Sequence, residues 1–135
     1  MTPTAPASPD PALRALAAAD ADACPTLLTA LAHDAVPRVR HAAVRHPSLP
    51  PRAMLETARR ADAETCEMLG ENPAAPSSVI RLLARHLAVE VRLAVARHPR
   101  MDLVTLERLA DDRSAMVRSV AQAILERRLS GAAPA

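Results

Sequence analysis

The chain has 135 residues, a formal net charge of +2 and an apolar fraction of 50%, which suits one domain with a core of its own. It contains no Phe, Tyr or Trp, so the core must be aliphatic, which favours helix-on-helix packing over β-sheet. The small net charge argues against a protein whose affinity comes mainly from contacts to phosphate.

The chain begins with a Pro- and Ala-rich segment, residues 1–9, which we expect to be a disordered arm. This segment lacks the basic and apolar stretches of a signal peptide, and no later run is apolar for long enough to cross a membrane. The two cysteines, Cys24 and Cys66, show no metal-ligand spacing, and we interpret them as reduced thiols. We therefore expect a cytoplasmic protein, and the Arg-only, Ala-rich composition indicates a bacterial source.

A repeat with a period of about 26 residues, a length typical of stacked supersecondary units that bury a continuous core, organises the rest of the chain. The pairs His46-Pro47, Asn72-Pro73 and His98-Pro99 follow one another at this period, and three columns of mostly apolar positions keep the same spacing. The columns are Leu28, Met54, Ile80 and Leu106; Leu31, Thr57, Leu83 and Leu109; and Val39, Thr65, Val91 and Val117.

In chain order, the pattern predicts a half-unit at 10–24, four two-helix units at 25–50, 51–76, 77–102 and 103–128, and a frayed tail at 130–135. The repeat domain is thus 10–129, and the half-unit is expected to cap its N-terminal end. Pro25 and Pro51 suit the first position of a helix, while Ser77 and Asp102 suit an N-cap. The last second helix lacks a His-Pro stop and is expected to run on over 117–129.

The segment from Leu31 to Pro50, with its Leu-Ala, the Asp three residues after the Leu, the Val-Arg and the His-Pro-x-x-Pro, resembles the leucine-rich repeat variant family. The resemblance covers about residues 25–125 and extends more broadly to HEAT-like repeats. It implies an all-α, right-handed superhelical solenoid in which the second helix of each pair is either α or 3₁₀.

That resemblance also implies a structural role for an Asp and an Arg six residues apart, which in HEAT-like repeats form a ladder linking neighbouring units. An Asp in the turn can accept backbone N–H groups, and an Arg can pair with it bidentately. The expected ladder residues are Asp34, Arg40, Arg92, Asp112 and Arg118. The ladder is interrupted in the middle of the chain, where Arg60, Cys66 and His86 occupy the corresponding positions.

Charged residues recur at equivalent positions of the second helices, which in such a stack line the concave side about 10 Å apart. Arg-bearing units flank a middle unit whose second half, residues 61–76, carries acidic residues and no Arg. The candidate partner-binding residues are Arg38, His41, Arg45, Glu64, Glu67, Glu71 and Arg97. Two interpretations stay open: the charges neutralise one another as solvated pairs, or the alternating strip selects a protein or peptide of matching charge.

The sequence shows no ordered nucleophile–base–acid motif, no Gly-rich phosphate loop and no metal-binding motif, so we expect no catalytic residue, cofactor or metal. We interpret His46 and His98, like Asn72, as residues that cap a helix end or bind a loop carbonyl. The favoured function is a non-catalytic scaffold or adaptor that binds a protein or peptide, monomeric or weakly self-associating. The alternative is a nucleic-acid-binding HEAT-like module. Continuous Arg along one face would favour nucleic acid, whereas Arg-Glu-Arg banding favours a protein.

Overall fold

The computed structural model describes residues 8–131, and these form nine α-helices and no strand, which confirms the expected all-α class for this part of the chain. The helices are α1 Pro11–Ala19, α2 Pro25–Leu31, α3 Pro37–Val44, α4 Pro51–Arg60, α5 Ala63–Gly70, α6 Ser77–Leu83, α7 Val89–Ala96, α8 Leu103–Leu109 and α9 Ala115–Leu129. The second helices are α-helical throughout, so the 3₁₀ alternative is wrong for the described residues.

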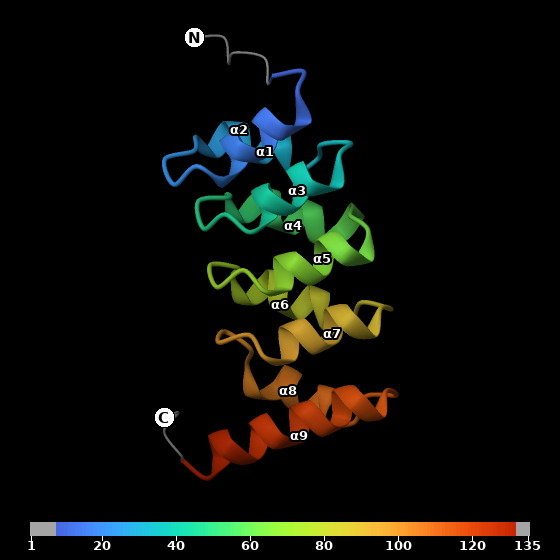
Figure 1. Cartoon of the computed structure of the whole chain (residues 1–135). Helices are drawn as coiled ribbons and strands as arrows, with labels where there is room; N and C mark the ends of the chain where they lie inside the picture. Colours follow the sequence, from blue (N-terminus) through green and yellow to red (C-terminus); the bar gives the residue numbers. More distant parts are fainter. Residues whose placement is uncertain (1–7, 132–135) are drawn as a thin grey trace.

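The helices stack in two rows, with α1 and α9 at opposite ends (Figure 1). The odd-numbered helices contact one another in chain order, and the even-numbered helices lie beside them. The odd helices begin at Pro11, Pro37, Ala63, Val89 and Ala115, each one repeat period after the previous one. The even helices begin at 25, 51, 77 and 103, with the same spacing. The periodicity of the sequence is therefore a periodicity of helix positions.

Local sequence explains most helix starts. Pro25 and Pro51 occupy the first helical position, where a missing N–H costs nothing. Asp102 caps α8, because its carboxylate accepts the Thr105 N–H at 2.7 Å. Ser77 is not an N-cap, contrary to expectation. Pro76 takes the extended cap conformation and Ser77 is the first helical residue, with its hydroxyl 3.5 Å from the Arg100 carbonyl oxygen.

The three columns of repeated positions form the centre of the core. Every one of their twelve residues has an exposed fraction of 3% or less. The two columns of the even helices face the column of the odd helices, so each short helix is held by its neighbours rather than by its own stability. Thr57 fits in this setting because its hydroxyl donates to the Ala53 carbonyl at 2.9 Å.

The two ends of the stack differ. At the N-terminal end α1 covers α3, and its Leu13 and Leu16 are 53% and 68% exposed because no helix packs on their outer side among the described residues. At the C-terminal end α9 is the longest helix, and the Arg128 guanidinium donates to the Met101 carbonyl. Most of the expected arm, residues 1–7, and of the expected tail, residues 132–135, lies outside the described part. Between residues 8 and 131, no helix is both long and apolar enough to span a bilayer.

Candidate functional site

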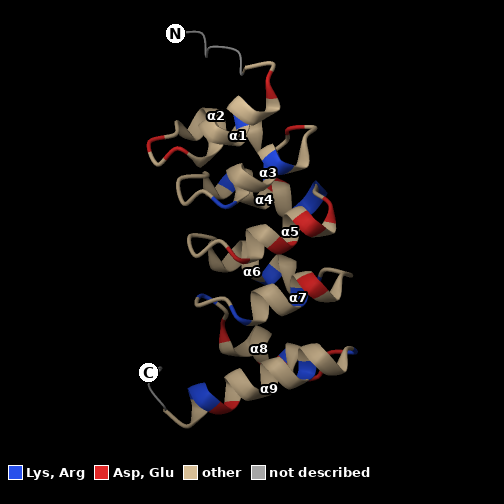
Figure 2. Ribbon diagram, in the orientation of Figure 1, with Lys and Arg blue, Asp and Glu red and all other residues tan. Residues whose placement is uncertain are grey.

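The seven charged or polar residues singled out in the sequence lie on or beside α3, α5 and α7, three neighbours in one row. We call this set the banded strip: Arg38, His41, Arg45, Glu64, Glu67, Glu71 and Arg97. Five members are exposed, and His41 and Glu67 are half-buried. Figure 2 shows basic residues on α3 and acidic residues on α5, the next helix of the row. The strip therefore carries alternating charge along the stack.

The charges of the banded strip do not neutralise one another by contact. Among residues 8–131 the ion pairs involve other partners, and no strip Arg lies within 4.0 Å of a strip carboxylate. Within the described structure, the strip charges therefore form no direct ion pairs with one another.

Glu71 occupies a position that helix stability does not explain. It is the C-cap of α5, just as Arg45 and Arg97 are the C-caps of α3 and α7. A helix C-terminus carries partial negative charge, so the two arginines stabilise their helices and Glu71 destabilises its own. A residue that destabilises its own helix without a compensating structural contact is a candidate for a functional role.

Two hollows lie along the row of the strip. One, of about 500 Å³, lies between α1 and α3 and includes Arg45 in its lining. The other, of about 240 Å³, lies between α5 and α7 and is lined by Glu71 and Arg97, among others. Gly70 lines the second hollow and allows α5 and α7 to approach closely, because a Cβ there would lie 3.0 Å from Val95 Cγ1. The strip thus presents both charged side chains and hollows to a partner.

The expected ladder residues link neighbouring units, as the resemblance implies, but the Arg that binds each Asp carboxylate is not the one six residues ahead. Arg92 binds the Asp112 carboxylate bidentately, at 2.9 Å through Nε and 3.0 Å through Nη2. Its other nitrogen, Nη1, donates to the carbonyls of His86 and Leu87. The carboxylate partner of Arg92 is thus twenty residues ahead, in the next unit, and the offset of six residues is bridged by a backbone carbonyl. Arg118 follows this rule by donating to the Asp112 carbonyl at 2.7 Å.

The N-terminal half-unit carries a ladder residue that the sequence reasoning missed. Arg14 donates to the Asp34 carboxylate at 2.8 Å and 3.2 Å, and its guanidinium holds the pKa of Asp34 below its usual value. The signal was present, because Arg14 lies one repeat period before Arg40. Arg40 in turn donates to the Asp34 carbonyl and reaches Asp62 at 3.3 Å. Asp62 thus supplies the carboxylate that the repeat lacks at Arg60, which stands in the position of Asp34.

The interruption of the ladder is absorbed by neutral contacts. Cys66, in the place of an Arg, is buried, and its Sγ lies 3.6 Å from the Ala61 carbonyl oxygen. Burial raises the pKa of the Cys66 thiol to about 11, so it remains protonated. His86, in the place of an Asp, accepts the Ala88 N–H at Nδ1, as Asp112 accepts the Ser114 N–H. The hydrogen bond to the N–H of the N-cap residue is therefore kept where the ion pair is lost.

The residues before Pro47, Pro73 and Pro99 form a second ladder. His98 accepts the Arg100 N–H at Nδ1 and donates from Nε2 to the Asn72 carbonyl at 2.8 Å. Asn72 donates to the His46 carbonyl, and His46 contacts the Asp20 carbonyl at 2.7 Å in the same way. Each side chain thus reaches 26 residues back along the chain. Both ring nitrogens of these histidines are engaged, so the carbonyl-binding interpretation is confirmed.

One cluster of potential metal ligands lies beside the banded strip. Donor atoms of His41, Asp62 and Glu64 lie within 4.8 Å of one another, and the buried His41 Nε2 has no hydrogen-bond partner within residues 8–131. Asp62, however, already accepts from the Thr65 N–H and hydroxyl at the start of α5, and Arg40 lies beside it. A helix N-terminus and a guanidinium both oppose a cation there. The cluster therefore joins two strip residues without forming a good metal site.

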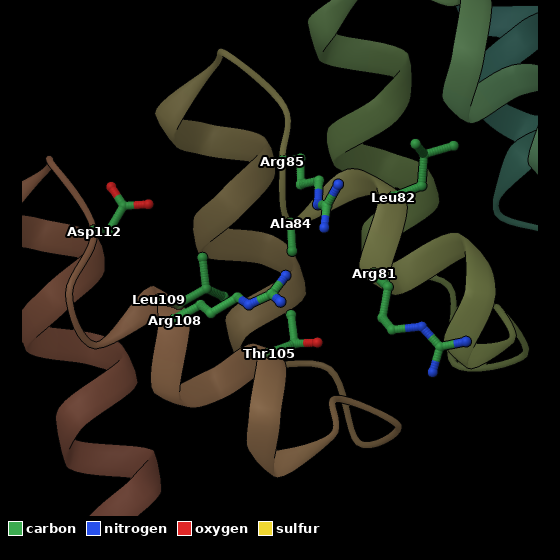
Figure 3. Close-up of a pocket in the computed structure, with 8 residues that line it drawn as sticks. All are labelled: Arg81, Leu82, Ala84, Arg85, Thr105, Arg108, Leu109 and Asp112. Carbon is green, nitrogen blue, oxygen red and sulfur yellow. The ribbon is translucent and has the colours of Figure 1, made fainter.

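A cavity that the sequence reasoning did not anticipate lies between α6 and α8. It has a volume of about 390 Å³ and is lined by Arg81 and Arg85 from α6 and its C-terminal turn, by Thr105, Arg108 and Leu109 from α8, and by neighbouring residues. Figure 3 shows Arg108 extending from α8 toward Ala84 in the direction of the Arg85 side chain. Within the described structure, the guanidinium groups of Arg85 and Arg108 have no acidic partner.

Comparisons with protein-family models, with curated proteins and with solved structures find no match to this chain.

Proposed function

We propose that this chain is a non-catalytic scaffold or adaptor that binds another protein through the banded strip. The proposal includes the solenoid itself: a right-handed superhelical stack of the kind found in leucine-rich repeat variant and HEAT-like proteins. It also includes a bacterial, cytoplasmic setting and a monomeric or weakly associating state. The regular helix starts and the two ladders support the repeat architecture, since each contact recurs with the unit.

The observation that carries the proposal is the set of unpaired, alternating charges along one row of helices. The strip has Arg38 and Arg45 on one side, Glu64 and Glu71 in the middle, and Arg97 beyond them, and these residues form no ion pair with one another. Such a pattern gives a protein partner a matching register and disfavours a ligand of uniform charge. A continuous phosphate backbone would meet repulsion at α5, which supports a protein over nucleic acid.

The rigidity of the stack supports binding by a pre-formed surface. The side chains beneath the strip are fully buried, and Asn72 and His98 tie the ends of α5 and α7 to the preceding units. A surface that is already ordered loses little entropy on association, so modest contacts suffice for specific binding. The two buried histidines, His46 and His98, are bound to backbone groups and add to this rigidity.

The test is charge reversal at the centre of the strip. Glu71→Arg should weaken binding to the partner captured from the host's lysate by about tenfold or more, which corresponds to about 1.4 kcal/mol. Folding should be unharmed, because a positive charge suits the C-cap of α5. Glu107→Arg, on the exposed side of α8, is the matched control and should bind as the natural chain does. Equal affinity for both variants would contradict the proposal.

A further inference from the structure

The cavity between α6 and α8 stands where the preceding pair of helices has apolar contacts. Arg81 on α6 occupies the repeat position of Leu55 on α4, which is partly buried against the core. On α8, Thr105 and Arg108 occupy the repeat positions of Val79 and Leu82, which are respectively buried and packed on the core. Helices α4 and α6 pack along each other, whereas α6 and α8 enclose the cavity. The three positions are therefore apolar between α4 and α6, and polar or cationic between α6 and α8. Between α2 and α4 they are mixed, with Thr29, Ala53 and Glu56.

These exchanges are unfavourable for the stack by itself. They remove apolar contacts and place cationic side chains on both sides of one gap. Arg81 has only a distant partner, Asp102, at 3.6 Å with both side chains substantially exposed. The nearest acid at the other end of the cavity, Asp112, is already bound bidentately by Arg92. The cavity thus combines uncompensated positive charge with apolar walls from Leu109 and Ala84.

We propose that this cavity is a binding site for acidic side chains of a partner protein, namely a short segment that places Asp or Glu beside an apolar residue. Guanidinium groups from two helices can bind a carboxylate bidentately, and Leu109 can cover the adjacent apolar side chain. The inference rests on the proposed scaffold function, to which it adds a second contact site and the chemistry of the segment bound there.

The surroundings favour a peptide over nucleic acid. A volume of about 390 Å³ holds a few side chains rather than a duplex. The chain has no aromatic residue on which a base could stack. Exposed acids on and after α8, Glu107 and Asp111, interrupt the basic surface that a run of phosphates requires. Charge complementarity therefore selects separate carboxylates with apolar neighbours.

The experiment follows the arginine side chains directly by NMR. The full chain, labelled at Arg, is titrated with an octapeptide in which Glu and Leu alternate, and separately with the same peptide carrying Gln for Glu. The Nε–Hε signals of Arg85 and Arg108 should shift saturably with the Glu peptide, and at least tenfold more peptide should be needed with Gln. An absence of saturable shifts at millimolar Glu peptide overturns the inference. Stronger, salt-sensitive shifts with a single-stranded RNA octamer also overturn it.

Substitution of Arg108 provides a second test of the site. Arg108→Leu restores the residue found at the equivalent position of α6, so it should fold at least as well as the natural chain while weakening the Glu peptide by about tenfold. Arg52→Leu, on the exposed side of α4, is the matched control and should leave the affinity unchanged. Equal weakening by both variants would reduce the effect to net charge and contradict the inference.

The variants Glu71→Arg and Arg108→Leu together separate this inference from the proposed function. If Glu71→Arg abolishes capture of the host partner and Arg108→Leu does not, the scaffold function stands and the cavity inference fails. If the Glu peptide binds at Arg108 but no host protein depends on Glu71, the cavity binds acids and the function assigned to the banded strip fails.

Discussion

The buried ion pair between Arg92 and Asp112 makes the sharpest prediction about stability. The two side chains are only 4% and 9% exposed, so Asp112→Ala leaves a buried guanidinium without its counter-charge. Breaking such a pair costs about 3–5 kcal/mol. We expect a value near the lower end, because Arg92 keeps its bonds to the His86 and Leu87 carbonyls. Loss of the acceptor for the Ser114 N–H adds about 1 kcal/mol. The total, about 4 kcal/mol, corresponds to roughly 10–20 °C in Tm.

The assay is urea unfolding monitored by far-UV circular dichroism. Asp111→Ala is the matched control, because Asp111 is exposed and forms no ion pair within residues 8–131. The chain itself suggests a rescue, because Cys66 and His86 replace the ion pair one repeat earlier. The double change Arg92→Cys and Asp112→His reproduces that arrangement and should lower the free energy of unfolding by less than Asp112→Ala. If Asp112→Ala costs only about 1 kcal/mol or less, the residue acts as a cap only, and the role of the ion pair in joining units is refuted.

Two further predictions concern titratable groups. Burial lowers the pKa of His98, so the unfolded chain binds a proton below about pH 6.5 that the folded chain resists, and stability should fall as pH drops from about 7.5 toward 5.5. His98→Asn, which copies Asn72, should make stability less dependent on pH, as measured by urea midpoints across this range. An unchanged pH dependence would contradict the assignment of the effect to His98. The thiols should differ in reactivity toward a disulfide reagent. Cys24 is exposed and its pKa is lowered by the Leu27 N–H, whereas Cys66 is buried with a pKa of about 11. One fast thiol, lost in Cys24→Ser, is expected; two fast thiols would contradict the burial of Cys66.

Much of the helical arrangement could be predicted because it depends on spacing. Columns such as the one that contains Leu28 and Met54 recur once in every unit, and similar local patterns produce the same helix starts and the same burial. Proline sharpened these boundaries, since it can begin a helix but cannot continue one. The preference for α over 3₁₀ in the second helices could not be read this way, because both forms share nearly the same apolar pattern.

The contacts between units were harder to predict because they depend on which side chain reaches across. Asp34 has Arg40 six residues ahead and Arg14 twenty residues behind, and only the packed stack shows that its carboxylate binds Arg14 while its carbonyl binds Arg40. The cavity was missed for a related reason. The repeat positions of Arg81 and Arg108 change character from unit to unit, as Thr29 and Glu56 show, so no recurring pattern marks the cavity.

The measurement that tests the central claim most directly is affinity capture from the host's lysate. The tagged chain would be used at low and at physiological salt, with and without nuclease, beside the Glu71→Arg variant. The account predicts a protein partner that survives nuclease and is depleted by the variant, because the banded strip supplies the specificity. Recovery of nucleic acid that is lost at the higher salt, with no effect of Glu71→Arg, would show a phosphate-binding protein and contradict the account.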